Sequence, residues 1–126
     1  MLVAGVDVGA ATAKTVILSD GKILSYAIMP TGFDVIYAAN EITKLALEKV
    51  GRSMDDLKFV ISTGYARSTV SFANKALTEI LCHAKGAHFL LPEVRTIIDI
   101  GGQDSKVIGV NEAGNVVDFV MNDKCA

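Results

Sequence analysis

Two stretches of this chain combine an aspartate, a turn of small residues and a lysine in the same spacing. The first runs from Asp7 through Gly9 to Lys14, and the second runs from Asp99 to Lys106, so the lysine follows the aspartate by seven residues in both. A turn of glycine and alanine lets backbone N–H groups approach an anion, because little or no side chain intervenes. An aspartate at a strand end can hold Mg²⁺, directly or through water. Two such loops together predict a site that binds a polyphosphate from two sides.

The residues of the two turns fall into three predicted roles. Those predicted to contact phosphate are Gly9, Ala10, Ala11, Thr12 and Lys14 in the first turn, and Gly101, Gly102, Gln103, Ser105 and Lys106 in the second. Asp7 and Asp99 are predicted to hold the shell of a Mg²⁺ ion, and Gln103 is predicted to position an attacking water, because a neutral amide does not compete for the metal. The alternative is structural, since a glycine turn between strands is commonly only a turn and an aspartate there commonly caps it.

The elements expected around the first stretch form a meander followed by a crossover. Residues 2–8, 13–18 and 23–29 are apolar runs separated by turn residues, which predicts three antiparallel strands. Residues 34–50 carry apolar side chains at helical spacing, which predicts an amphipathic helix. Residues 59–62 then predict a strand that is parallel to its neighbour, because a helix connects the two.

The elements expected around the second stretch repeat that meander. Residues 77–91 predict a second helix, whereas residues 66–76 follow neither a helical nor a strand period. Residues 96–100, 104–110 and 116–121 then predict three antiparallel strands again, displaced from the first three by 92 residues. The chain therefore reads as one complete α/β unit and the beginning of a second copy.

Composition excludes several classes of protein. The 126 residues are 51% apolar, which is enough for a folded core. A formal net charge of −2 offers no basic surface, so nucleic acid is not expected as a partner. The sequence has no run of 18 apolar residues and no leader with a basic start, so neither membrane insertion nor secretion is expected. Two cysteines without a C-x-x-C pair favour a reducing cytoplasm.

Beyond these local patterns, four stretches carry a family resemblance: residues 62–67, 79–87, 97–108 and 121–126. They resemble the activators of 2-hydroxyacyl-CoA dehydratases and the related ATPase subunits of benzoyl-CoA reductase, within the actin–sugar kinase–Hsp70 ATPase superfamily. Asp7 with Lys14 looks like the first phosphate loop of that superfamily, and the stretch from Asp99 looks like the second. The resemblance implies an actin-like ATPase (ribonuclease H-like) fold with a mixed sheet. It implies a first subdomain at residues 1–93 and the first three strands of a second subdomain at residues 94–126.

The resemblance also implies cofactors and partners. It implies a homodimeric, oxygen-sensitive ATPase that uses ATP with Mg²⁺ to drive an electron from a ferredoxin- or flavodoxin-type donor to a dehydratase component. In that family a 4Fe–4S cluster lies at the dimer interface, held by two cysteines from each subunit, and Cys125 in an Asn-Asp-Lys-Cys-Ala motif matches the first of them. The match for the second lies beyond residue 126, so the cluster is not expected to assemble in this chain alone. Cys82 matches no ligand position and is predicted to be a small buried residue.

Two other functions remain open from the sequence. A sugar-kinase-like phosphotransferase has the same fold, but it would need an aspartate base near the sugar and no cysteine at position 125. A truncated module that folds or dimerises without turnover is the third hypothesis. His83 and His88 are five residues apart and have no acidic partner nearby in the sequence, so both are predicted to be structural.

Overall fold

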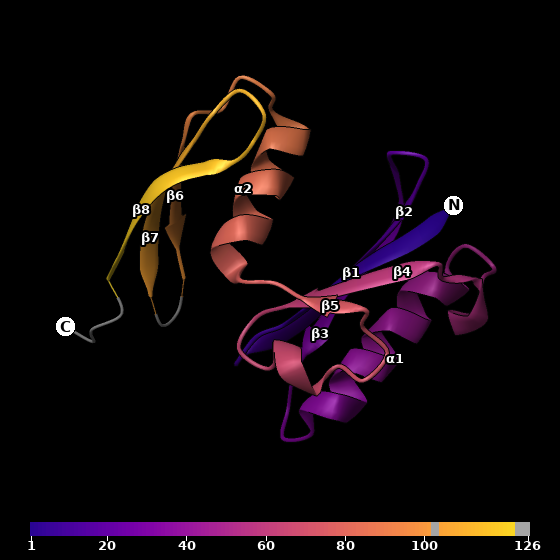
Figure 1. Cartoon of the computed structure of the whole chain (residues 1–126). Helices are drawn as coiled ribbons and strands as arrows, with labels where there is room; N and C mark the ends of the chain where they lie inside the picture. Colours follow the sequence, from indigo (N-terminus) through magenta and orange to yellow (C-terminus); the bar gives the residue numbers. More distant parts are fainter. Residues whose placement is uncertain (102–103, 123–126) are drawn as a thin grey trace. The chain divides into compact units, whose positions relative to one another are not determined.

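The computed structural model describes residues 1–101 and 104–122, and they form two compact units, Met1–Leu77 and Thr78–Ala126. The first unit contains a five-stranded sheet and the second a three-stranded sheet, and each sheet has one α-helix on it (Figure 1). In the described ranges, no helix is long and apolar enough to cross a membrane.

The first unit opens with the predicted antiparallel meander. Its strands are β1 (Leu2–Val8), β2 (Thr12–Ser19) and β3 (Lys22–Pro30). The turn between β2 and β3 is tight because Asp20 and Gly21 both adopt a positive φ, of 51° and 76°. An Asp-Gly pair accepts these dihedral angles readily, so the sequence determines this hairpin locally.

Helix α1 (Val35–Glu48) follows the meander and has well-defined ends. The Asp34 carboxylate accepts a hydrogen bond from the backbone N–H of Tyr37 at 3.0 Å and so caps the first turn. Gly51, with a φ of 66°, ends the helix in the left-handed conformation that glycine allows. The predicted helix at residues 34–50 is thus confirmed to within two residues at its C-terminal end.

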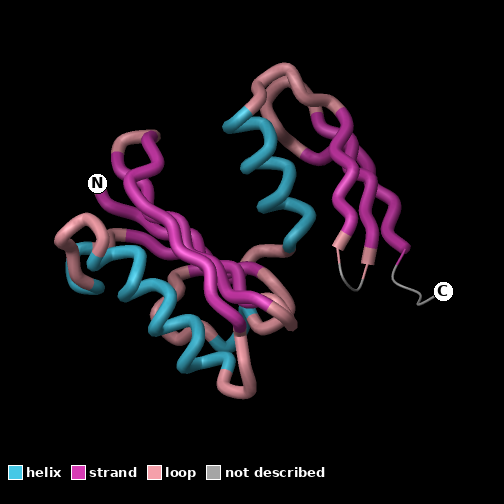
Figure 2. The backbone as a smooth tube through the Cα atoms, turned by 180° about the vertical axis from the view of Figure 1, so that it is seen from behind, coloured by secondary structure: helices cyan, strands magenta, loops and turns pink. Residues whose placement is uncertain are grey.

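Helix α1 covers one face of the sheet formed by β1, β2 and β3, as Figure 2 shows. Ile42 and Leu47 are fully buried there, and each contributes about 1.5–3 kcal/mol through the hydrophobic effect. Within this core the Thr43 hydroxyl donates to the carbonyl oxygen of Ala39 at 2.8 Å and lies 3.0 Å from the Thr15 hydroxyl, so both buried hydroxyl groups have a hydrogen-bond partner.

A parallel strand then joins the other edge of β1. A 3-10 turn, η1 (Met54–Asp56), leads to β4 (Phe59–Thr63), which pairs in parallel with β1 as predicted. Residues 66–76, which show no sequence period, form a second 3-10 turn, η2 (Arg67–Thr69), and a two-residue strand, β5 (Lys75–Ala76). The strand order β3-β2-β1-β4-β5 therefore makes a mixed sheet.

The second unit starts with α2 (Glu79–Leu90) and continues as β6 (Thr96–Ile100), β7 (Ser105–Val110) and β8 (Val116–Asn122). The three strands form an antiparallel sheet in the order β6-β7-β8, which confirms the second meander. Helix α2 is shorter than the predicted segment at residues 77–91 and ends before Pro92.

The chain divides after Leu77, whereas the sequence-based boundary lies after residue 93. The difference is the position of α2, which packs on the second sheet through Ala84, against Ile108 and Val110. An apolar stripe predicts that a helix has a buried face, but it does not say which of two sheets will cover that face.

The two meanders share a detail beyond strand order. The register between the second and third strands shifts between Ile17 and Leu18 in the first unit and between Gly109 and Val110 in the second. These irregularities are 92 residues apart, the displacement expected from the sequence. The repeat thus extends from the strand order to the local backbone geometry.

The sheet of the second unit has an open apolar face. Ile98, Val107 and Val120 lie side by side on neighbouring strands and are 69%, 44% and 71% exposed. The counterparts of the first two in unit 1 are Val6 and Thr15, which are buried on the face that α1 covers. The second sheet therefore presents to solvent a face whose equivalent in the first unit is packed.

Candidate functional site

The first predicted loop places its aspartate and lysine directly opposite one another. Asp7 near the end of β1 and Lys14 in β2 are register partners, and Lys14 Nζ lies 3.4 Å from Asp7 Oδ2. Lys14 Nζ also donates to Thr12 Oγ1 at 2.9 Å. The Lys14 side chain remains 36% exposed, so its ammonium group is accessible as well as paired. Asp7 and Lys14 therefore form an ion pair, which the sequence analysis did not predict, and the lysine remains accessible.

Hydrogen bonds within the loop and from Thr31 hold the backbone of this loop in place. The N–H of Gly9 donates to the carbonyl oxygen of Thr12 at 3.0 Å and closes the turn. Thr31 holds the turn a second time, because its N–H donates to Ala11 O at 3.0 Å and its hydroxyl donates to Gly9 O at 2.8 Å. Ala10 and Ala11 at the tip are exposed. The sequence did not reveal Thr31, because its contacts span twenty residues or more.

A glycine after β4 approaches the first loop closely. Gly64 has a φ of 95°, and a Cβ added there would collide with Asp7 Oδ1 and with the carbonyl group of Val8. The neighbouring Thr63 is the register partner of Asp7, and its hydroxyl is buried without a hydrogen-bond partner among the described residues. The Ser-Thr-Gly segment thus forms one wall of the Asp7 site, a contact that no local pattern predicted.

The second predicted loop reproduces this backbone. Asp99 in β6 and Lys106 in β7 are register partners, and the N–H of Gly101 donates to Asp104 O at 2.8 Å. Both relations match those of Asp7–Lys14 and of the first turn at a displacement of 92 residues. Gly102 and Gln103 lie outside the described residues, so the predicted role of Gln103 in positioning water stays a prediction.

Lys106 differs from its counterpart in its surroundings. Its side chain is only 3% exposed, and its Nζ lies 2.6 Å from Asp104 Oδ1, 3.3 Å from Asp99 Oδ2 and 3.7 Å from Glu79 Oε2. Burial by itself lowers the pKa of Lys106, but its hydrogen bonds to Asp104 and Asp99 and the charges of Asp104 and Glu79 outweigh that effect and raise the pKa above its ordinary value of 10.5. Lys106 is therefore a fully charged and enclosed cation.

The two histidines of α2 have different environments. His83 Nδ1 lies 3.4 Å from Asp99 Oδ2, so the expectation that no acid is near His83 is wrong. The sequence missed this contact because the two residues are 16 positions apart and meet only when α2 packs on β6. His88 Nε2 lies 2.7 Å from the carbonyl oxygen of Glu112, a structural contact to the β7–β8 loop, as predicted.

Asp7 and Asp99 could each give a Mg²⁺ ion few protein ligands. Each hairpin offers one aspartate at the position predicted for the metal shell, and carboxylate oxygens are ligands that Mg²⁺ accepts. In residues 1–101 and 104–122, no three His, Cys, Asp or Glu side chains are grouped as a metal site. An ion bound there would take most of its ligands from water and phosphate, which is the usual mode of Mg²⁺. Cys125 lies outside the described residues, and Cys82 is a free, half-buried thiol of α2.

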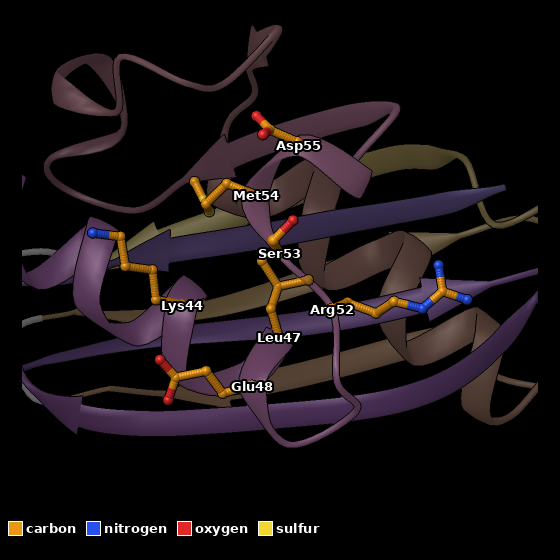
Figure 3. Close-up of a pocket in the computed structure, with 7 residues that line it drawn as sticks. All are labelled: Lys44, Leu47, Glu48, Arg52, Ser53, Met54 and Asp55. Atoms are coloured by element: carbon orange, nitrogen blue, oxygen red, sulfur yellow. The ribbon is translucent and has the colours of Figure 1, made fainter.

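A shallow pocket lies at the C-terminal end of α1 (Figure 3). It is lined by Lys44, Leu47, Glu48, Arg52, Ser53, Met54 and Asp55. The charged ends of these side chains spread around the pocket and do not converge on its centre, as Figure 3 shows. This pocket is separate from the predicted loops and adds nothing to their chemistry.

Comparisons with known proteins agree with the geometry. Residues 4–126 match the BadF/BadG/BcrA/BcrD ATPase family. The activator of lactoyl-CoA dehydratase from Anaerotignum propionicum is 45% identical over 127 residues, which cover 100% of this chain and 49% of the relative.

Two solved structures match the whole chain. Component A of (R)-2-hydroxyglutaryl-CoA dehydratase from Acidaminococcus fermentans superposes with a TM-score of 0.94 at 39% identity, over 100% of this chain and 49% of that one. The activator of 2-hydroxyisocaproyl-CoA dehydratase from Clostridium difficile, solved with bound ADPNP, superposes with a TM-score of 0.90 at 40% identity, over 100% and 47%. The likeness confirms the predicted actin-like ATPase fold with a mixed sheet. The chain spans about half the length of the relatives it matches.

Proposed function

Because this chain belongs to the BadF/BadG/BcrA/BcrD ATPase family, we propose that its two hairpins are the phosphate-facing loops of an ATP-hydrolysing activator of a 2-hydroxyacyl-CoA dehydratase. The observation that carries the proposal is the repeated register, in which Asp7 faces Lys14 and Asp99 faces Lys106 behind turns of the same hydrogen-bond pattern. The names of the matching relatives support the substrate class of the partner enzyme. Those relatives are about twice as long, so the proposal concerns residues that match about half of such an activator.

In this proposal the first hairpin binds phosphate directly. Lys14 is partly exposed and is offset by a single carboxylate, so a phosphate oxygen can gain an ion pair with its ammonium group. The exposed tip residues Ala10 and Ala11 let their backbone N–H groups approach the same oxygens. Thr31 keeps the tip in place by binding the loop from its other side.

The second hairpin has a different balance of charge. Lys106 is enclosed by three carboxylates, so it acts mainly as their fixed counter-charge, whereas Ser105 is exposed and open to a ligand. Gln103 is proposed to orient the water that attacks the terminal phosphate. A Mg²⁺ ion, when bound with the nucleotide, would neutralise phosphate oxygens, and Asp7 and Asp99 are the residues that would hold its shell.

The electron-transfer part of the proposal rests on Cys125 and on the family resemblance. Cys125 is proposed to ligate a 4Fe–4S cluster shared by two subunits, which would receive an electron from a ferredoxin- or flavodoxin-type donor in a reducing cytoplasm. Two copies of this chain supply two such thiolates, whereas a 4Fe–4S cluster is usually held by four. The remaining ligands would have to come from sequence that the longer relatives have beyond the matched half.

Nucleotide binding by the chain is the direct test. We expect calorimetric titration with ADPNP and Mg²⁺ to show binding that Lys14→Met weakens about 10- to 100-fold, because a hydrogen bond to a charged group contributes about 1.5–3 kcal/mol. Lys22→Met is the matched control, since it removes the same charge from the turn at the far end of the β2–β3 hairpin. Equal binding by both variants and the wild type would refute the phosphate-facing role of the first hairpin.

Activity separates the proposal from the sugar-kinase-like rival, and nucleotide binding separates it from a module that only folds or dimerises. Addition of the chain, ATP and a reductant to an inactive 2-hydroxyacyl-CoA dehydratase component should be compared with addition of a relative of full length. Activation by the longer protein and nucleotide binding without turnover by this chain are the expected results. Phosphorylation of a sugar would instead favour the sugar-kinase-like alternative, and absence of nucleotide binding would favour a module without turnover.

A further inference from the structure

A buried nitrogen of α2 faces the second aspartate. His83 Nδ1 is inaccessible to solvent and has no hydrogen-bond partner among the described residues. The nearest acidic oxygen is Asp99 Oδ2, at 3.4 Å. A buried polar nitrogen without a partner is costly, so a ring nitrogen this close to a carboxylate gains stability when it carries the hydrogen and a small rotation of either side chain completes the bond. Asp99 is therefore the natural partner of His83 Nδ1.

Two groups approach the same oxygen of Asp99 from different elements. Lys106 Nζ reaches Asp99 Oδ2 at 3.3 Å from the neighbouring strand, and His83 Nδ1 reaches it at 3.4 Å from the helix. Lys106 cannot move away easily, because Asp104 holds it at 2.6 Å and Glu79 at 3.7 Å. With Oδ2 engaged on both sides, Oδ1 is the oxygen available to a metal shell or a water.

Helix α2 places His83 next to Asp99. Glu79 and His83 are four residues apart, so they project from one face of the helix, Glu79 toward Lys106 and His83 toward Asp99. Thr78 caps the first turn by accepting the N–H of Leu81 at 3.5 Å, which fixes where this face begins.

Asp7 is the equivalent acid in the first hairpin, and its ion pair is with a residue of the same hairpin. Asp7 meets Lys14 at 3.4 Å, and Lys14 in turn meets the hydroxyl of Thr12. Thr12 stands at the position equivalent to Asp104, so the first hairpin lacks that carboxylate near its lysine, as well as the one that Glu79 supplies in the second. The second aspartate is thus oriented by a dedicated helix face, a feature added to the repeated backbone.

We propose that His83 is a positioning residue that fixes the carboxylate of Asp99 by engaging Oδ2 and so presents Oδ1 to the Mg²⁺–nucleotide side of the second hairpin. The inference rests on the proposed function for the task of Asp99. His83 itself touches neither nucleotide nor metal and acts only through Asp99.

The orientation of Asp99 can be measured on this chain without nucleotide. Nitrogen-15 NMR of the His83 ring should show a hydrogen on Nδ1, and the side-chain carboxyl ¹³C signal of Asp99 should shift in His83→Leu. His83→Asn should restore most of that signal, because its amide nitrogen replaces Nδ1 in position and as a donor. His88→Leu is the matched control on the same helix and should leave Asp99 unchanged. The inference is overturned if the His83 ring carries its hydrogen on Nε2 alone, or if the carboxyl ¹³C signal of Asp99 does not shift in His83→Leu.

Titration with Mn²⁺ and ADPNP then separates this inference from the proposed function. The paramagnetic ion should broaden the Asp99 signal in the wild type, with an apparent affinity about 10- to 100-fold weaker in His83→Leu than in His83→Asn. Broadening at Asp99 that is the same in all variants overturns the role of His83 and leaves the proposed function standing. Absence of broadening at both Asp7 and Asp99 in the wild type overturns the proposed function, and with it the task assigned here to Asp99.

Discussion

Replacement of the two lysines by methionine should have very different effects on stability. Lys106→Met removes the lysine that lies among three carboxylates, and a buried ion pair broken in this way typically costs about 3–5 kcal/mol. The side chains of those acids are 27–36% exposed, so water relieves part of their repulsion and we expect the lower end, about 3 kcal/mol. Lys14 is 36% exposed beside one carboxylate, so Lys14→Met should cost about 0–1 kcal/mol.

Hydrogen exchange measured by NMR resolves the two effects, because each unit reports its own opening. Slowly exchanging amides of β6 and β7 should lose about two powers of ten in protection in Lys106→Met, since each 1.4 kcal/mol is tenfold. Amides of β1 and β2 should change less than about fivefold in Lys14→Met. Equal losses in the two variants, or a Lys106→Met chain as protected as the wild type, would show that the carboxylates around Lys106 do not depend on its charge.

Three further predictions follow from the described residues. The pKa of Lys106 is raised in the folded state, so the charged lysine stabilises the second unit below pH 10.5, and this effect is lost as the pH rises through the higher folded-state pKa. Urea unfolding of the second unit should therefore show a decline in stability at alkaline pH. That decline should be absent in Lys106→Met. Gly64→Ala should destabilise the first unit by about 2 kcal/mol or more in thermal unfolding, because the added Cβ meets Asp7 and Val8. Gly86→Ala, on the open surface of α2, should instead stabilise the second unit by about 0.5–1 kcal/mol. Val107→Lys should reduce self-association in sedimentation experiments at high concentration without loss of folding, because Val107 lies on the open apolar face of the second sheet.

The parts of the fold that the sequence predicted are those set by local chemistry. Apolar runs interrupted by turn residues determine each meander, and the capping residue Asp34 and the glycine at position 51 determine the ends of α1. Residues 66–76 gave no prediction, because a three-residue 3-10 turn and a two-residue strand are too short to show a period. The position of α2 also escaped prediction, since a helical stripe carries no information on which sheet it will meet.

The candidate site likewise contains features that were visible in the sequence and features that depend on tertiary packing. The shared spacing of seven residues was visible in the sequence, whereas the Asp7–Lys14 and Asp99–Lys106 ion pairs appear only in the hairpin register of the structure. The contribution of His83 required the packing of a helix against a strand sixteen residues away, although its spacing of four from Glu79 was a visible sign of a shared face. The approach of Gly64 to Asp7 likewise depends on the parallel pairing of β1 and β4.

The two hairpins show how a repeated backbone can acquire two different electrostatic environments. Turn closure and register are fixed by main-chain hydrogen bonds, so they recur wherever the spacing of glycine and strand residues recurs. The side chain that follows the turn is not constrained in this way, and a threonine at position 12 leaves Lys14 with one carboxylate whereas an aspartate at position 104 gives Lys106 a second. Glu79 adds a third at 3.7 Å, so three carboxylates surround the ammonium group of Lys106, whereas one lies beside that of Lys14. The residue after the turn and the packing of α2 together distinguish the two lysines, so that Lys14 stays partly exposed and Lys106 is enclosed by the protein.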